Sequence, residues 1–297
     1  MLPDWYANCL RSTETIAARP AFFIVGCQKS GTTWLQRLAN AHPQVACNGE
    51  GHYGDILAPI LKQALEAYNG QAKVKIEFGN PHLMSVTRFL IDQHLAATIG
   101  AKSDPVGVKA VGDKTPEQAL ALPILHALYP DARFVHIIRD GRDGCVSGWA
   151  HLGRQGEQGK FDSFADYIEY FTTGHWMPYI RQAQAVSGAL PKQCIEFRYE
   201  RLLSEPMLEV GRLFEFLGVE TSEATLAKVI DESSFKNASG GRQPGEEDAN
   251  SFLRKGIAGD WVNHFDEEAV ERFERCAGDF LRNLGYGDPV GEGAAQT

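Results

Sequence analysis

The residues with the clearest chemical potential lie between a short apolar run and a helical pattern near the start of the chain. The segment Gly26-Cys-Gln-Lys29-Ser-Gly31-Thr-Thr-Trp34 follows the apolar residues 21–25. Backbone N–H groups at the beginning of a helix have no partner within the helix and bind anions, and glycines let the backbone approach an anion closely. The segment therefore predicts a phosphate-binding loop between a buried strand and a helix.

The spacing of this loop departs from the Walker pattern G-x-x-x-x-G-K-[ST] in one respect. Gly26 and Gly31 have the Walker separation and Thr33 stands at the Ser/Thr position, but Thr32 occupies the place of the lysine. The loop carries its lysine, Lys29, three residues earlier. We expect its charge to act on one phosphate held by the loop rather than on the terminal phosphates of a nucleoside triphosphate. An ordinary glycine turn with a solvated lysine is the alternative.

The elements that must position this loop alternate between strands and helices. Apolar runs predict strands at residues 21–25, 45–47, 106–111, 133–138 and 194–198. This alternation predicts an α/β fold with a central, mainly parallel sheet and helices on both faces, a P-loop-like three-layer α/β/α domain. Helical spacing predicts helices that begin at Thr32 and end before Pro43, and at residues 54–68, 82–98, 116–129, 143–152, 163–187, 205–217, 222–232 and 266–283.

One segment departs from this rhythm. Residues 236–260 are rich in Gly, Ser, Pro, Asn and Glu, which makes them too poor in apolar residues for a core and too long for a routine connection. A disordered surface loop and a functional lid are both compatible with this composition. The cationic sequence Arg254-Lys255-Gly256 favours a lid-like loop over a bound cofactor. We expect residues 1–297 to form a single domain that includes this loop.

The composition limits the classes of protein that the chain can represent. The 297 residues include 29 Lys and Arg against 38 Asp and Glu, which gives a net charge of −9 and a pI of about 5.5. General nucleic-acid binders are basic, so we expect no nucleic-acid partner. The six cysteines form no CxxC pair and indicate neither a disulfide framework nor a zinc site. No secretory signal and no apolar run of about 18 residues occurs, so we expect a cytoplasmic protein without a membrane span.

The loop and several later segments resemble the sulfotransferases that use 3′-phosphoadenosine 5′-phosphosulfate (PAPS). The 5′-phosphosulfate loop of that family is similar to Lys29-Ser30-Gly31-Thr32-Thr33-Trp34. Matches follow in the family's order from residue 22 to residue 265, so the resemblance covers nearly the whole chain. The later matches are Arg139 with Ser147, Tyr199-Glu200, Ser234-Phe235, Arg254-Lys255-Gly256, Gly259-Asp260-Trp261 and Asn263-His264-Phe265.

The resemblance implies a reaction and a set of cofactor contacts. A member of this family moves a sulfonate group from PAPS to a hydroxyl or amine of a small-molecule, lipid or glycan acceptor and releases adenosine 3′,5′-bisphosphate (PAP). Residues 29–33 are expected to hold the 5′-phosphosulfate, and Trp34 and Phe235 the adenine, with Tyr199 nearby. The 3′-phosphate is expected to bind Arg139, Ser147, Arg254, Lys255 and Gly256. Arg142 is a further candidate for a phosphate contact, and a surface or interstrand ion pair is the alternative for Arg139.

The chemistry explains why a lysine is wanted in this loop. In sulfuryl transfer the departing 5′-phosphate gains negative charge, and Lys29 with the backbone donors of residues 30–33 can stabilise it. By analogy with the loss of one oxyanion donor, we expect removal of Lys29 to lower the rate by about 10² to 10³. We expect no metal ion, because the loop handles one phosphate and one sulfonate without the β/γ charge density that kinases neutralise with magnesium.

The general base is less clear from the sequence. Cytosolic members of the family place a histidine in a Lys-Thr-His element, but the corresponding stretch here ends Asp113-Lys114-Thr115-Pro116. Members that modify carbohydrates or tyrosines use a glutamate after the second strand, where this chain has Glu50. His52 is the second candidate, and a solvated turn carboxylate is the alternative for Glu50. We expect residues 113–114 to line the site, because ligands gather at the carboxyl ends of strands in such sheets.

Two other functions stay open at this stage. A P-loop nucleotide kinase should carry a lysine at position 32 and an acid for magnesium, and a non-catalytic PAP-binding protein could keep the fold without the chemistry. The acceptor is not readable, and the chain is expected to be a monomer or a homodimer. We expect the acceptor pocket to come from residues 50–100 and 150–185, whose aromatic residues are Tyr53, Tyr68, Phe78, Phe89, Phe161, Phe164, Tyr167, Tyr170, Phe171 and Trp176.

Overall fold

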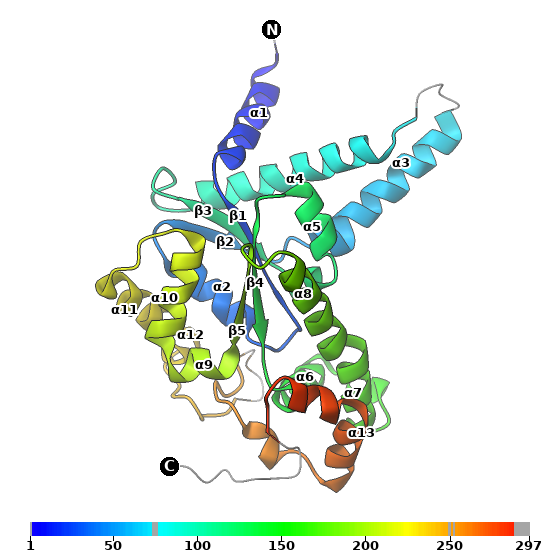
Figure 1. The fold of residues 1–297 in the computed structure, drawn as a ribbon, viewed down its shortest axis with the longest axis vertical. Helices are drawn as coiled ribbons and strands as arrows, with labels where there is room; N and C mark the ends of the chain where they lie inside the picture. The colour runs from blue at the N-terminus through cyan, green and yellow to red at the C-terminus, as the bar shows by residue number, and fades with distance from the viewer. Residues whose placement is uncertain (1, 73–76, 249–250, 252, 288–297) are drawn as a thin grey trace.

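The computed structural model describes residues 2–72, 77–248, 251 and 253–287, and it contains a five-stranded sheet (Figure 1). All neighbouring strands are parallel, in the order β2-β3-β1-β4-β5. The strands are β1 (Ala21–Gly26), β2 (Val45–Asn48), β3 (Ala110–Lys114), β4 (Arg133–Ile138) and β5 (Cys194–Arg198).

Helices cover both faces of this sheet, as its sequence requires. Successive residues of a strand point to opposite faces, so Phe22 and Ile24 enter one apolar cluster while Phe23 and Val25 enter the other. The first cluster lies under α2 (Thr32–Ala41), α9 (Tyr199–Ser204), α10 (Pro206–Leu217) and α11 (Glu223–Glu232). The second lies under α1 (Asp4–Ala17), α4 (Asn80–Gly100), α5 (Leu122–Leu128), α6 (Gly141–Gln155), α7 (Phe164–Phe171), α8 (Met177–Ala189) and α13 (Glu267–Asn283). The predicted three-layer α/β/α fold is confirmed.

The parallel arrangement gathers the candidate site residues at one edge of the sheet. β1 pairs with β4 so that Gly26 lies opposite Ile137, and the segments after these two strands begin side by side. Lys114 ends β3, and Tyr199 follows β5 directly. Because carboxyl ends of parallel strands meet at the same edge, residues far apart in sequence become neighbours there.

The third strand lies later in the chain than its apolar pattern predicts. The prediction of 106–111 is wrong by several residues, because β3 spans Ala110–Lys114 and pairs with β1 from Val111 to Lys114. Its second half is not apolar, yet it is buried. A Cβ atom at Gly112 would lie 2.3 Å from the carbonyl oxygen of Phe22, so only glycine lets the two strands approach there. The Asp113 carboxylate accepts hydrogen bonds from side chains and backbone that surround it.

Three predicted helices are interrupted. The helix predicted at 54–68 begins with a π-helical turn, η1 (Tyr53–Leu57), before it continues as α3 (Ala58–Ala72). The helix predicted at 116–129 is a 3₁₀ turn η2 (Pro116–Ala119) followed by α5, and the one predicted at 163–187 is divided by a π-helical turn η4 (Thr172–Trp176) between α7 and α8. Pro178 lies in the first turn of α8, where its missing N–H group interrupts the regular hydrogen-bond ladder. The remaining elements are η3 (Gln158–Lys160), α12 (Phe235–Ala238) and η5 (Asp260–Asn263).

Candidate active site

A cavity of about 910 Å³ opens at the carboxyl edge of the sheet. The phosphate loop, the end of β4, helix α6 and segments 233–235 and 253–258 contribute to its walls. Most of the residues predicted for the site line it, and the exceptions are Ser30, His52, Asp113, Lys114 and Arg142. The lining members of the predicted set are Lys29, Gly31, Thr32, Thr33, Trp34, Glu50, Arg139, Ser147, Tyr199, Phe235, Arg254, Lys255 and Gly256.

The backbone of the phosphate loop is held in a shape that needs glycine. Gly31 precedes the first turn of α2 with φ of 99°, and a Cβ atom there would lie 2.6 Å from the Tyr199 ring. Lys29 has φ of 70°, also in the left-handed region. Ser30 is buried, and both its hydroxyl and its backbone N–H donate to the Cys27 carbonyl. The Ser30 side chain therefore closes the loop and does not reach the cavity.

Lys29 lies in an environment that disfavours its charge. Burial, followed by the positive charge of Arg154, lowers the pKa of the Lys29 ammonium to about 8. A buried ammonium beside other cations is relieved by a bound anion. The site is thus suited electrostatically to a phosphate group.

Arg139 connects three segments of the cavity wall. Its Nη1 donates to the Lys29 carbonyl at 3.3 Å and its Nη2 to the Ile257 carbonyl at 2.9 Å. The guanidinium carbon lies 4.2 Å from the centre of the Tyr199 ring. The Nη2 nitrogen of Arg139 also lies 3.4 Å from the Asp143 carboxylate, so Arg139 combines the predicted place at the cavity with an ion pair.

Arg142 is placed differently from Arg139. Its side chain is buried, forms several hydrogen bonds to the Asp140 carboxylate and lies 4.0 Å over the Trp261 ring. It is not among the residues that line the cavity. Arg142 therefore forms an internal ion pair with Asp140, two residues earlier in the chain, and contributes no contact to the cavity wall.

The segment that carries Arg254 and Lys255 is anchored by two buried carboxylates. Asp260 accepts hydrogen bonds from both cations, and Asp143 of α6 accepts from the backbone N–H groups of Gly259 at 2.7 Å and Trp261 at 2.9 Å. Burial alone would raise the pKa of Asp260, but the hydrogen bonds from these cations and Asn263 hold it well below its usual range. Residues 249, 250 and 252 of the predicted lid lie outside the described residues.

Two aromatic side chains that the sequence predicts beside an adenine, Trp34 and Phe235, also line the cavity. The Trp34 indole donates to the Ser233 carbonyl at 3.1 Å and meets the Tyr199 ring edge-on at 5.7 Å. Phe235 begins α12, and Gly256 passes so close to it that a Cβ atom would lie 2.3 Å from its ring. Two aromatic rings, one on each side, can hold a flat base.

Glu50 faces the cavity, whereas His52 lies behind it. The Glu50 carboxylate forms a direct ion pair with Lys114, whose ammonium also lies 3.4 Å from the Thr33 hydroxyl. Lys114 is buried, so it brings a positive charge between the phosphate loop and Glu50. The backbone N–H of Gly51 donates to Asp113 at 3.0 Å and fixes the turn that carries both candidates.

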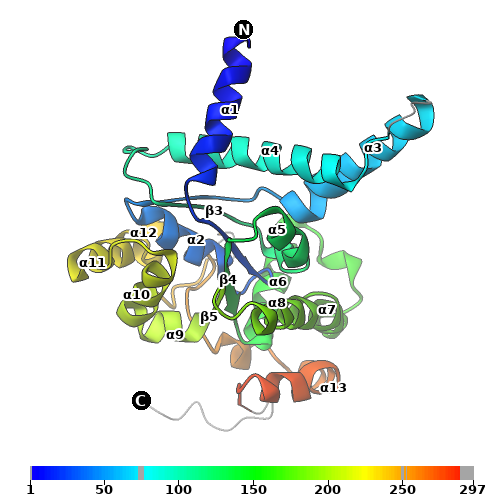
Figure 2. The same ribbon diagram turned by 45° about the horizontal axis from the view of Figure 1, so that its top comes forward.

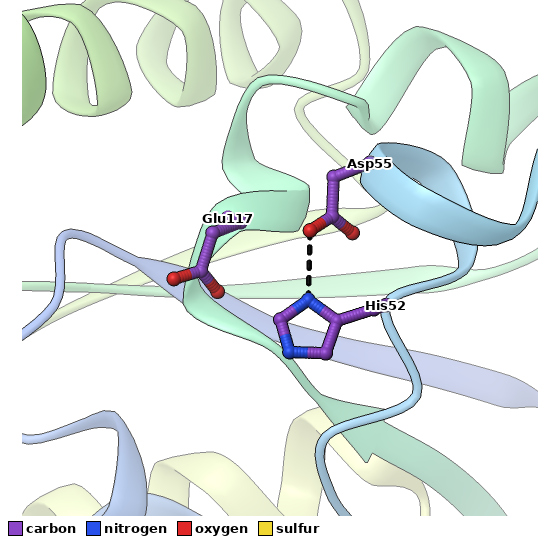
Figure 3. A group of neighbouring side chains, drawn as sticks. All are labelled: His52, Asp55 and Glu117. Carbon is purple, nitrogen blue, oxygen red and sulfur yellow. Dashed lines mark hydrogen bonds and ion pairs between the residues drawn. The ribbon is translucent and has the colours of Figure 1, made fainter. Parts of the chain in front are cut away.

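His52 belongs to a cluster with two acids. Its Nδ1 lies 2.7 Å from the Asp55 carboxylate, and its Nε2 lies 3.8 Å from Glu50 (Figure 3). Burial opposes protonation of His52, but the hydrogen bond and charge of Asp55 outweigh it and raise the pKa. Donor atoms of His52, Asp55 and Glu117 lie within 4.8 Å of one another, which makes them the group that could hold a metal ion within the described part of the chain.

The expectation for the acceptor pocket fits the cavity only in part. Phe161, Tyr167, Tyr170 and Phe171, from the predicted range 150–185, line the cavity, but the aromatic residues predicted from 50–100 do not. Tyr53 and Trp176 are buried in the core, and α3, which carries Tyr68, extends away from the sheet (Figures 1 and 2). The predicted residues that do not line the cavity are Tyr53, Tyr68, Phe78, Phe89, Phe164 and Trp176.

Several further residues that the sequence analysis did not single out line the cavity. They are Gln28 of the phosphate loop, Glu117 of η2, His151 of α6 and His175 of η4. His175 lies in the π-helical turn η4, which the periodicity of the sequence does not indicate. Glu117 follows closely on β3, which ends at Lys114, and this position after a buried strand was the signal that could have identified it.

Comparisons with known proteins agree with this geometry. A sequence model described as "Sulfotransferase family" matches residues 20–223, which is more than half of the chain. The chain therefore belongs to the sulfotransferase family and is a sulfotransferase. Cytosolic sulfotransferase 16 of Arabidopsis thaliana is 26% identical over 314 residues, covering 95% of this chain and 83% of that protein. A candidate protein-tyrosine sulfotransferase of Caenorhabditis briggsae is 26% identical over 275 residues, covering 89% of this chain and 88% of the relative.

A solved structure shares the fold. A mouse sulfotransferase complexed with PAP superposes with a TM-score of 0.58 at 18% identity, covering 89% of this chain and 85% of the mouse chain. At this identity the likeness concerns the fold. Within the described residues, no helix is both long enough and apolar enough to cross a membrane.

Proposed function

We propose that the protein transfers a sulfonate group from PAPS to an acceptor hydroxyl and releases PAP. The observation that carries this proposal is the single cavity that gathers Lys29, Arg139, Ser147 and the Arg254-Lys255 pair on its walls. Lys29 lies in the loop after β1, whereas Arg139 follows β4 and Arg254 and Lys255 lie in the late segment. Such a pair of cationic regions suits a nucleotide with phosphates on both its 5′ and 3′ carbons.

The residues of the chain would divide the work. Lys29, the backbone amides that begin α2 and the Thr33 hydroxyl would hold the 5′-phosphate and stabilise the charge that develops on it as it leaves. Arg139, Ser147 and Arg254 would hold the 3′-phosphate, and Trp34 and Phe235 the adenine. We expect no metal ion to be needed, because Lys29 and Lys114 supply the positive charge beside one phosphate and one sulfonate.

We assign the general base to Glu50. It lines the cavity, and His52 does not. Lys114 holds one oxygen of Glu50 next to the phosphate loop, which keeps the carboxylate near the place of reaction. Glu50 would take the proton of the acceptor hydroxyl as oxygen attacks sulfur, a role that contributes about 10² to 10⁴ in rate.

A phenolic hydroxyl is the acceptor group that the cavity supports best. Four aromatic side chains line the acceptor end, and flat rings pack well against such a wall. The names of two relatives point to phenols as well, since one is a candidate protein-tyrosine sulfotransferase and another is a flavonol sulfotransferase-like protein. The cytosolic relative and the six unpaired cysteines support a location in the cytoplasm.

Labelled PAPS tests the proposal with a panel of phenols, alcohols, glycans and amines. Sulfonate transfer to at least one acceptor is expected, with large losses for Lys29→Ala and Glu50→Gln and none for Lys62→Ala, an exposed lysine of α3. PAP should bind to the wild type by calorimetry. PAP binding without transfer to any acceptor would favour a non-catalytic protein, and magnesium-dependent turnover of a nucleoside triphosphate would favour a kinase. A normal rate for Glu50→Gln with loss in His52→Ala would move the base to His52.

A further inference from the structure

The part of the cavity that the cofactor residues leave unassigned has an aromatic wall. Phe161, Tyr170, Phe171 and His175 form this wall. The His175 ring lies 4.8 Å from the Tyr170 ring and stacks on the Phe171 ring at 6.3 Å, while Phe161 lies 5.1 Å from Tyr170. Burial lowers the pKa of His175, so at neutral pH the wall presents ring faces rather than a positive charge.

A carboxylate, Glu117, lines the same part of the cavity. Gln28 donates to its Oε1 at 2.6 Å, whereas its Oε2 is buried and has no hydrogen-bond partner. In the described part of the chain, no Lys, Arg or His nitrogen lies within 4.0 Å of this carboxylate. A ring nitrogen of His52 lies within 4.8 Å of this carboxylate, but the shorter contact of the ring is the one that its Nδ1 makes with Asp55, at 2.7 Å (Figure 3). A partly buried carboxylate without a cation is unfavourable, and a positive charge beside it would relieve that cost.

The other carboxylates on the cavity wall have such a partner. Glu50 pairs with Lys114, and Glu157 pairs with Lys160 at 3.0 Å. Glu117 therefore stands out among the described lining residues. A carboxylate next to aromatic ring faces is the arrangement that recognises an ammonium group, through an ion pair and cation–π attraction together.

We propose that the acceptor carries, besides its reacting hydroxyl, an alkylammonium group that binds between Glu117 and the aromatic wall. This inference rests on the proposed function, because the hydroxyl must lie near Lys29 and Glu50. Gln28 holds Glu117 and directly precedes Lys29, so the ammonium site and the reaction centre are neighbours. A small hydroxylated amine can reach both. The net charge of −9 also favours the approach of a cation.

Two phenols of nearly equal shape test this inference. Tyramine has an ammonium group at the place where 4-propylphenol has a methyl group. We expect wild-type kcat/KM for tyramine to exceed that for 4-propylphenol by at least about 10-fold, the scale of a charge-assisted hydrogen bond. Glu117→Gln should remove most of this preference by lowering the tyramine value, with the 4-propylphenol value within about twofold. Glu66→Gln, the same charge change on the exposed face of α3, is the matched control.

The outcomes separate this inference from the proposed function. Equal use of both phenols by the wild type, or equal losses for both in Glu117→Gln, overturns the ammonium site. Transfer to neutral alcohols alone overturns it too and leaves the proposed function standing. If no acceptor reacts, calorimetry with PAP-loaded protein decides, since stronger binding of tyramine than of 4-propylphenol still supports the site. Binding of one equivalent of Zn²⁺ that displaces tyramine and is lost in His52→Ala would make the cluster a metal site instead.

Discussion

The protonation state of Lys29 should set the upper pH limit of cofactor capture. Burial and neighbouring cations lower the pKa of this ammonium to about 8 in the free protein. The protonated fraction is then about 0.9 at pH 7 and about 0.09 at pH 9. If only the charged form captures the anionic donor, kcat/KM for PAPS falls about tenfold between these pH values. A bound anion raises the pKa again, so kcat at saturating PAPS should fall less.

The assay is the initial rate of sulfonate transfer at limiting PAPS from pH 6.5 to 10. If the protein accepts an alcohol, that alcohol serves as acceptor, because it does not ionise in this range as a phenol does. Lys29→Arg provides the comparison, because a guanidinium stays charged over this range. The variant should lose the alkaline limb even if its rate is lower, since Arg is not equivalent to Lys in shape. A wild-type profile that is flat to pH 10, or an unchanged limb in Lys29→Arg, would refute the assignment of this titration to Lys29.

Three further predictions concern the walls of the cavity. Asp260→Asn should weaken PAP binding by about tenfold in calorimetry, because two cations lose their buried anchor, and unchanged affinity would contradict that role. Gly31→Ala should lower the free energy of unfolding by about 1 to 3 kcal/mol in urea titrations, since its positive φ and the Tyr199 ring both oppose a Cβ atom. Arg142→Ala should lower it by about 3 to 5 kcal/mol by leaving Asp140 unpaired, while PAP affinity in the folded protein stays within about twofold. A large loss of PAP affinity in that variant would restore Arg142 to the cofactor site.

The part of the cavity that we assign to the cofactor is lined by residues whose sequence signals are local. A buried strand, a glycine loop and a helix follow one another within residues 21–41, and Arg139 follows a second strand of the same type. Parallel pairing then brings the two loops together without any further information. The orientation of a side chain within the loop is not a local property, and Ser30 turns inward to the Cys27 carbonyl.

The acceptor end could not be predicted in the same way. Aromatic composition does not tell which helices reach the sheet edge, and Tyr68 of α3 does not line the cavity because that helix extends away from the sheet (Figure 2). The register of β3 depended on a close approach at Gly112, which apolar patterns do not reveal. Glu117 and His175 lie in the 3₁₀ turn η2 and the π-helical turn η4, each close to a proline. Apolar spacing of an α-helix does not predict which side chains face the cavity from such turns.

The strand order explains why the cavity opens at this edge of the sheet. The helix that follows β1 covers one face of the sheet, while the helix that follows the adjacent β3 covers the other. Where two chain segments leave in opposite directions, a crevice remains between them. None of the described residues of α3 lines this cavity. Insertions or deletions at the end of α3 should therefore leave the cavity unchanged, so this helix can vary in length.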